Sequence, residues 1–489
     1  MRATRGNVLA LDQGTSGTKA LVVSAERGVL ASVEVPVRPR YGPGGSVEQD
    51  PGELLASVVE AGRRALAAAG ETVDAVGLAN QGETVLAWDP GTGEPLGDAV
   101  VWQDRRSADV CRRMAAEAGW LEALTGLALD PYFAAPKMTW LRENRTGAGV
   151  VTTSDVWLVH RLTGAFVTDA STASRTLLLD LDSCAWSPRA AEAFGLGSEV
   201  RPEVVDAAGS FGSTGAFGPG AGPDGGPVPL TGLLVDQQAA LLGQGCLQPG
   251  MAKCTYGTGA FLLANVGGAA LRSASGLTTS VAWRLAGLPT YCLDGQVFTV
   301  ASAVRWLVDL GVLSAADDLD RVGASAAGAG GVTFVPALAG LGGPWWRGDA
   351  RGALTGLHLG TGAGELVRAL VEGIAAQVAV LASSAAADLG AAITSLRVDG
   401  GLTRSALLMQ AQADLLQVPV EVFASPDATA LGVAAAARLG LDPGLSLDAA
   451  VPPWPAAAVY EPAVSRDEAA ERLGSFQRAV VAVLGGAGA

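Results

Sequence analysis

The chain has 489 residues, 49% of them hydrophobic and 17% charged, and its formal net charge is −15. An acidic chain of this kind repels nucleic acid and anionic membranes, and no apolar run reaches the ~18 residues of a membrane span, so neither is expected as a partner. The length allows two large domains, and five scattered cysteines without metal-ligand spacing favour reduced thiols in the cytoplasm.

The first elements predicted along the chain form a β-hairpin around a turn rich in glycine and hydroxyl groups. Apolar, β-prone residues fill 8–11 and 20–24, and Gly14-Thr15-Ser16-Gly17 lies between them. Glycine lets backbone N–H groups approach a phosphate closely, and the hydroxyls of Thr and Ser add donors. The pattern therefore predicts a phosphate-binding turn.

A helix and two strands are predicted next. Asp50 before Pro51 is typical of a helix N-cap, and the helix is expected to run over 54–69 and to stop at Gly70. Buried strands follow at 73–79 and 85–88. This alternation indicates an α/β fold, in which ligands bind where strands end.

The Gly-Thr turn recurs in the second half of the chain, at 255–259, where Thr258 follows Thr15 by 243 residues. A β-prone run comes after it, and helices are expected at 365–389 and 405–416 around a strand at 395–398. The repeat predicts two related lobes facing each other across a nucleotide. We place the first lobe at 1–245, where it would bind the phosphates and the small molecule that accepts a phosphoryl group. We place the second lobe at 246–489, where it would bind the nucleotide.

Asp236 is the first candidate catalytic residue. It is an isolated acid after the apolar run 230–235 and before a helix expected to begin near Ala239. A carboxylate at the end of a strand can take a proton from a substrate hydroxyl. The other interpretation is an N-cap for the helix, a position that Asp favours.

Asp12 and Lys19 flank the first turn. Asp12 can hold Mg²⁺ as a hard oxygen ligand, or accept hydrogen bonds from the Gly14 and Thr15 N–H groups, and the two roles are compatible. Lysine occurs only three times in the chain. The position of Lys19 favours a phosphate ligand, and its other interpretation is a solvated loop lysine.

Three aromatic residues lie near the motif turns: Trp102, Tyr132 and Phe261. Sugar and polyol sites stack a C–H face on such rings, although aromatic residues also fill cores.

These motifs resemble those of the FGGY carbohydrate kinases, and within that family the glycerol kinase branch, over nearly the whole chain. The similarity lies in ten short segments that occur in the same order. They are 10–15, 80–84, 101–106, 130–133, 236–240, 251–259, 340–344, 351–353, 397–401 and 429–432.

The resemblance implies an α/β fold of two actin-like lobes of the ribonuclease H type with a cleft between them. It implies ATP as phosphoryl donor, Mg²⁺, a small polyol or sugar as acceptor, and a homodimer or homotetramer. Asp236 would be the general base, and Asp12 with Asp236 would lie at the metal. The nucleotide and its phosphates would contact Thr15, Ser16, Lys19, Gly257, Thr258, Gly400, Gly401 and Ser405. The acceptor would contact Gly82, Glu83, Trp102, Tyr132, Asp236, Gln237 and Phe261.

Departures from the branch bear on the acceptor. Gly82 stands where glycerol kinases carry an arginine that donates hydrogen bonds to glycerol, and Ser405 stands where they carry an asparagine. Gly82 would leave a poorer glycerol kinase or make room for a longer acceptor, so a pentulose, tetritol or sugar acid is an alternative. A non-catalytic ligand-binding relative is a further alternative, against which the presence of both Asp12 and Asp236 argues.

Overall fold

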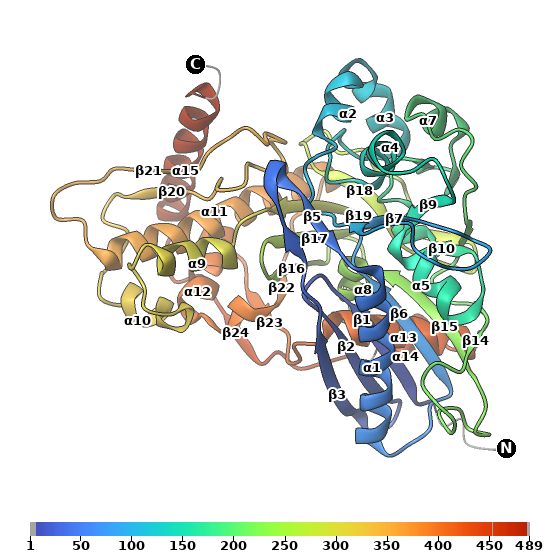
Figure 1. The fold of residues 1–489 in the computed structure, drawn as a ribbon. Coiled ribbons are helices and arrows are strands. Elements are labelled where there is room, and N and C mark those ends of the chain that lie inside the picture. The colour runs from blue at the N-terminus through green and yellow to red at the C-terminus, as the bar shows by residue number, and fades with distance from the viewer. Residues whose placement is uncertain (1–5, 452, 487–489) are drawn as a thin grey trace.

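Two β-sheets of matching strand order organise the chain (Figure 1). The computed structural model describes residues 6–451 and 453–486. The first sheet has the order β14-β15-β6-β1-β2-β3. Its strands are β1 (Val8–Gln13), β2 (Gly17–Ser24), β3 (Gly28–Pro36), β6 (Ala75–Asn80), β14 (Ser213–Thr214) and β15 (Val228–Val235).

The register of the first sheet gathers polar residues at one edge. β1 runs antiparallel to β2, with Asp12 opposite Lys19, and parallel to β6. β6 in turn runs parallel to β15, with Asn80 opposite Val235. Because parallel strands end at the same edge, the end of β1 and the segment after Val235, where Asp236 lies, reach the same edge of the sheet on either side of β6.

The second sheet repeats this plan in the order β18-β19-β17-β16-β22-β23-β24. β16 and β17 form an antiparallel hairpin around the second Gly-Thr turn. β22 runs parallel to β16, and β23 runs parallel to β22. The predicted repeat is therefore a repeat of topology. The strands are β16 (Ala252–Tyr256), β17 (Ala260–Gly267), β18 (Thr278–Leu285), β19 (Leu288–Val297), β22 (Leu396–Asp399), β23 (Val420–Val422) and β24 (Ala458–Tyr460).

Helices from both ends of the chain cover the first sheet. α1 (Pro51–Ala69), capped by Asp50 as predicted, packs against the face that carries Leu9 and Leu11. The opposite face carries Val8 and Ala10 and packs against α13 (Ala428–Leu441). α13 therefore completes the core of a sheet whose six strands all come from the first half of the chain.

α13 also crosses α8 (Asp236–Gly243) at very close range. A Cβ atom at Gly432 would lie 1.8 Å from the Ala239 carbonyl oxygen, so the crossing requires glycine there. This contact fixes the helix that begins with Asp236 against the C-terminal half of the chain.

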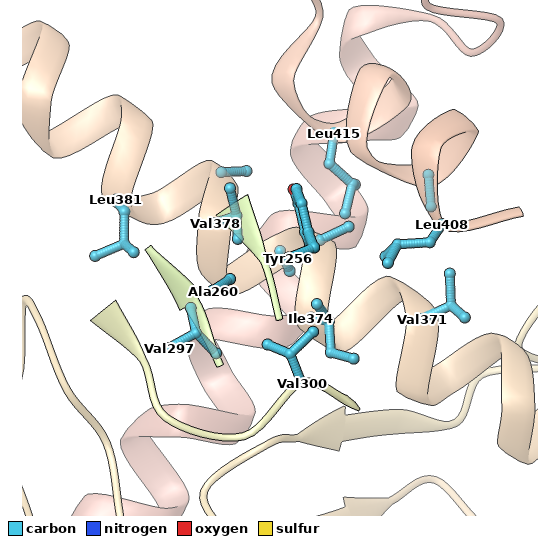
Figure 2. Packing of buried hydrophobic residues seen from close by; sticks show 14 of the residues in the cluster. Tyr256, Ala260, Val297, Val300, Val371, Ile374, Val378, Leu381, Leu408 and Leu415 are labelled. Carbon is cyan, nitrogen blue, oxygen red and sulfur yellow. The ribbon is translucent and has the colours of Figure 1, made fainter. Parts of the chain in front are cut away.

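The core of the second half lies between its sheet and two helices, α11 (Ala363–Leu389) and α12 (Ala406–Leu416). Figure 2 shows Val371, Ile374 and Val378 of α11 around Tyr256 at the end of β16. α11 is long and apolar enough to cross a membrane, but 72% of its apolar window is buried inside the protein. Burial of that kind is typical of a core helix.

The remaining elements surround these two cores. A five-stranded sheet contains β4 (Arg40–Tyr41), β5 (Val47–Gln49), β7 (Val85–Trp88), β8 (Ala99–Val100) and β9 (Val150–Thr153). Two-stranded pairs are β10 (Val167–Asp169) with β13 (Glu203–Val205), β11 (Leu179–Asp180) with β12 (Ala185–Trp186), and β20 (Thr333–Val335) with β21 (Ala353–Thr355). The other helices are α2 (Ala108–Arg113), α3 (Ala118–Thr125), α4 (Ala134–Asn144), α5 (Ser154–Thr163), α6 (Ala170–Ala173), α7 (Pro188–Ala193), α9 (Ala301–Asp309), α10 (Leu319–Gly323), α14 (Leu447–Ala450) and α15 (Arg466–Gly486).

Candidate active site

A small cavity of about 20 Å³ lies between the two sheets, and we call it the acceptor pocket. Five of the seven residues predicted to contact the acceptor line it. The lining residues are Glu83, Tyr132, Arg175, Val235, Asp236, Gln237, Gln238, Phe261, Leu263, Asp294 and Gln296.

Asp236 lies in the first turn of α8, directly after β15. Its Oδ1 accepts a hydrogen bond from the Gln237 N–H at 2.7 Å. The N-cap of α8 is Val235, so the helix starts three residues earlier than predicted and Asp236 does not cap it. Burial, and then the nearby charge of Glu83, raise the pKa of the Asp236 carboxyl to about 7.

Glu83 adopts a left-handed backbone conformation with φ of 56°. A non-glycine residue in this region carries strain, and such strain is common at functional sites. Its buried carboxylate accepts a hydrogen bond from Arg175 Nε at 2.7 Å, and Arg175 Nη1 bonds Asp294 on β19. Burial raises the pKa of Glu83, and the charge of Arg175 opposes that rise. Arg175 thus holds acidic residues from both halves of the chain together.

The three predicted aromatic residues form one cluster at the pocket. The ring of Trp102 lies edge-on to Tyr132 at 5.8 Å and to Phe261 at 5.9 Å between centroids. Tyr132 and Phe261 line the pocket, whereas Trp102 is not among its lining residues. Trp102 Nε1 donates to Thr15 Oγ1 at 2.8 Å, which ties the aromatic cluster to the first Gly-Thr turn.

Gly82 lies beside the pocket but is not among its lining residues. A Cβ atom built on Gly82 would lie 2.8 Å from Val235 Cγ2. The Val235 side chain therefore occupies the space that a side chain at position 82 would enter.

The first Gly-Thr turn places Asp12 and Lys19 on neighbouring strands. Lys19 Nζ lies 2.8 Å from Asp427 Oδ1, an ion pair between residues 408 positions apart. Burial, and then the charge of Asp236, raise the pKa of Asp12 to about 7. The Gly14 N–H, one of the groups that Asp12 was expected to satisfy, donates to the Gly17 carbonyl instead. Ser16 is exposed at the tip of the turn.

The second Gly-Thr turn meets the segment after β22. Gly400 has φ of 98°, and a Cβ atom there would lie 2.4 Å from the Tyr256 carbonyl oxygen. Only glycine fits this close approach, which brings Gly400 against the backbone of Tyr256, the residue before Gly257. Thr258 and Gly401 are exposed, and a Cβ atom at Gly401 would meet none of the described atoms within 4 Å. The two turns together leave backbone accessible to a ligand.

Ser405 stabilises α12, the helix that follows it. Its hydroxyl caps α12 by accepting from the Leu408 N–H, and it donates to Asp320 Oδ1. The side chain is buried by these contacts.

Lys253 links the acceptor pocket to the second turn. Its buried Nζ donates to Gln237 Oε1 at 2.6 Å and to Thr255 Oγ1 at 2.9 Å. Thr255 Oγ1 in turn donates to Asp399 Oδ1 at 2.5 Å, and burial lowers the pKa of Lys253. Lys253 is one of only three lysines in the chain, and that scarcity is a signal by which it could have been found.

Arg175, Asp294 and Gln296 were missed from the sequence. Asp294 and Gln296 are polar residues within an otherwise largely apolar buried strand, β19, and that anomaly was a usable signal. Arg175 stands in no motif that marks it. Only the fold brings it to the pocket.

No group of three or more His, Cys, Asp or Glu residues arranged to hold a metal occurs in 6–451 and 453–486. Mg²⁺ does not require one, because it usually binds through one or two carboxylates, water and substrate phosphates. Asp12 and Asp236 are hard oxygen donors, and the charge of Asp236 raises the pKa of Asp12. A cation would relieve that repulsion, so the donor set fits Mg²⁺.

Comparisons with known proteins cover nearly the whole chain. The model of the N-terminal domain of the FGGY family of carbohydrate kinases matches residues 7–243, and the model of the C-terminal domain matches residues 252–441. The glycerol kinase of Alkalilimnicola ehrlichii is 43% identical over 97% of both chains. That of Thermus brockianus is 43% identical over 88% of this chain and 90% of the relative.

Solved structures agree with this result. The crystal structure of Plasmodium falciparum glycerol kinase with ADP has a TM-score of 0.88 at 30% identity and covers 98% of both chains. A xylulose kinase from Rhodospirillum rubrum has a TM-score of 0.85 at 24% identity, over 99% of this chain and 100% of that one, which shows the fold alone. The predicted fold class, two actin-like lobes of the ribonuclease H type, is confirmed.

Proposed function

Because this chain belongs to the FGGY family of carbohydrate kinases, we propose that it transfers the γ-phosphoryl group of ATP to a terminal hydroxyl of glycerol. One observation carries the proposal. The Asp236 carboxylate lies in a small pocket between the two sheets, and its pKa is raised to about 7. The similarity to proteins named glycerol kinase over nearly the whole chain supports this choice of acceptor.

Asp236 acts as the general base in this proposal. It takes the proton of the attacking hydroxyl as that oxygen bonds to the γ-phosphorus and ADP leaves. A base works best when its pKa lies near the working pH, because it is then both ionised and basic. Glu83 and Gln237 orient the hydroxyls, and the rings of Tyr132 and Phe261 contact the C–H groups and exclude water.

Asp12 and Asp236 would hold Mg²⁺, which when bound neutralises charge on the phosphates and orients them. Thr15, Ser16 and Lys19 contact the transferred phosphate, and the second turn contacts the rest of the nucleotide through Gly257, Thr258, Gly400 and Gly401. Support comes from the exposure of Thr258 and Gly401. It also comes from the hydrogen bonds that run from Gln237, next to Asp236, through Lys253 and Thr255 to Asp399 at the second turn.

We further propose that 1–245 form the lobe that binds the acceptor and the phosphates, and 246–489 the lobe that binds the nucleotide. The gap between the two family matches, from 243 to 252, supports this division. A cytoplasmic homodimer or homotetramer completes the proposal. Light scattering on the purified protein tests the oligomeric state.

The experiment that tests the function is ADP release with Mg²⁺-ATP across a panel of acceptors: glycerol, erythritol, pentitols, xylulose, ribulose and gluconate. Fast turnover of glycerol that Asp236→Asn abolishes supports the proposal. A preference for xylulose or erythritol assigns the chain to the alternative kinases. Binding of ATP with no turnover of any acceptor assigns it to the non-catalytic alternative.

A further inference from the structure

Gln296 is a buried polar residue in the wall of the acceptor pocket. It lies on β19 directly opposite Phe261 of β17, and only 1% of its surface is exposed. Residues directly opposite in an antiparallel pair point to the same face of a sheet, so Gln296 and Phe261 line the pocket together.

The amide of Gln296 is held in one orientation. Its Nε2 donates to Asp294 Oδ1, and Asp294 Oδ2 is paired with Arg175, which also holds Glu83. A carboxylate paired with arginine only accepts hydrogen bonds, so the amide nitrogen must face Asp294. The amide oxygen therefore takes no part in the contact with Asp294 and can accept a hydrogen bond from another group.

That oxygen, Gln296 Oε1, has no hydrogen-bond partner within the described residues. A buried acceptor without a partner is destabilising, and native proteins rarely keep one without a reason. A ligand hydroxyl in the pocket would satisfy it. The unmet acceptor thus points to a hydroxylated ligand.

The charges of the lining residues restrict the class of ligand further. Glu83, Asp236 and Asp294 contribute three carboxylates, and Arg175 is the one cationic side chain among the lining residues, already bonded to two of them. An anionic acceptor such as a sugar acid would meet repulsion and no free cation in the lining. A neutral compound that donates several hydrogen bonds matches the lining.

We propose that Gln296 Oε1 accepts a hydrogen bond from a hydroxyl of a neutral polyol, other than the hydroxyl that is phosphorylated, and so sets acceptor specificity. This inference rests on the proposed function, since it names a determinant of the same site. Gln296 also supplies a polar contact in a pocket where Gly82 supplies none.

The test compares Gln296→Leu and Gln296→Met with a matched control, Gln377→Leu. Gln377 on α11 is also buried with an unpartnered Oε1, and it is not among the lining residues of the pocket. We expect each Gln296 variant to raise the KM for glycerol and its dissociation constant by calorimetry roughly tenfold. The kcat and the KM for ATP should change less than threefold, and Gln377→Leu should change none of these values.

Unchanged glycerol affinity in a folded Gln296 variant would overturn the inference, as would an equal change in Gln377→Leu. Preferential binding of gluconate over glycerol by the wild type would also overturn it. Glycerol binding without turnover would refute the proposed function alone, and the calorimetric comparison would still decide the role of Gln296.

Discussion

The side chain of Val235 lies against Gly82, because a Cβ atom at position 82 would come within 2.8 Å of Val235 Cγ2. Val235 ends β15, immediately before Asp236, and it lines the acceptor pocket. The loss of a side chain at 82 is thus accompanied by a branched side chain that fills the adjoining space. Gly82 therefore does not simply enlarge the pocket.

This contact predicts a coupling between positions 82 and 235. We expect Gly82→Arg to lower the free energy of unfolding by about 1–3 kcal/mol, because the new side chain must displace Val235. Val235→Ala in the same chain should recover at least half of that loss and lower the KM for glycerol. Urea denaturation of the two single variants and the double variant measures the coupling. Additive effects would show that Val235 does not constrain position 82.

Asp236→Asn should lower kcat by about 10²- to 10⁴-fold, because the amide cannot take the proton of the attacking hydroxyl. Affinity for ATP should remain near that of the wild type. Asp155→Asn is the matched control, because burial also raises the pKa of Asp155, to about 6, but this residue lies on α5 outside the acceptor pocket. Retention of kcat in Asp236→Asn, or an equal loss in Asp155→Asn, would show that Asp236 is not the general base.

The raised pKa values of Asp12 and Asp236 predict how stability depends on pH in metal-free protein. Both carboxyls have a pKa of about 7 when folded, well above their ordinary value of 3.8, so the folded state binds their protons more tightly. This stabilisation is complete at acidic pH below the ordinary value and is lost as the pH rises through about 7.

Thermal unfolding in EDTA should accordingly give a lower Tm at pH 8 than at pH 6. Asp12→Asn should raise the stability at pH 8 by about 1 kcal/mol or more, because it removes a charge that burial and Asp236 disfavour. Mg²⁺ should raise the Tm of the wild type at pH 8 more than that of Asp12→Asn. An identical response of both proteins to Mg²⁺ would take Asp12 out of the metal site.

Arg175→Met should be strongly destabilising, by about 3–5 kcal/mol, because it leaves Glu83 and Asp294 buried without their cation. Arg284→Met breaks the more exposed pair with Asp206, at 2.5 Å, and should cost no more than about 1 kcal/mol. Chemical denaturation measures both. Glu83→Gln added to Arg175→Met should recover part of the loss, and no recovery would mean that packing of the arginine stem dominates.

Local patterns predicted much of the fold and part of the site. Two Gly-Thr turns identified the repeated hairpins, and Asp50, Pro51 and Gly70 delimited α1, because caps and turns are set by residues close in sequence. Asp236 was found because strand, acid and helix follow one another directly. The start of α8 was placed too late because its N-cap is Val235, which provides no side-chain signal.

The rest depends on contacts between distant segments. Arg175 contacts Asp294 across 119 positions, and Lys19 contacts Asp427 across 408 positions. The sequence around each of these residues does not indicate which distant residue it contacts. The contribution of α13 to the first sheet is of the same kind. This helix is rich in alanine, a strong helix former, but nothing in its sequence indicates which sheet it covers.

The position of α13 has a consequence for synthesis of the chain on the ribosome. The strands β1, β6 and β15 and helix α8 emerge first, but the helix that covers one face of that sheet begins only at Ala428, roughly 185 residues after Gly243. At a synthesis rate of about 5–20 residues per second, that face stays uncovered for on the order of 10–40 s. Apolar residues such as Val8, Ala10 and Leu234 are exposed in the nascent chain during this interval, so this face is where a chaperone would be needed.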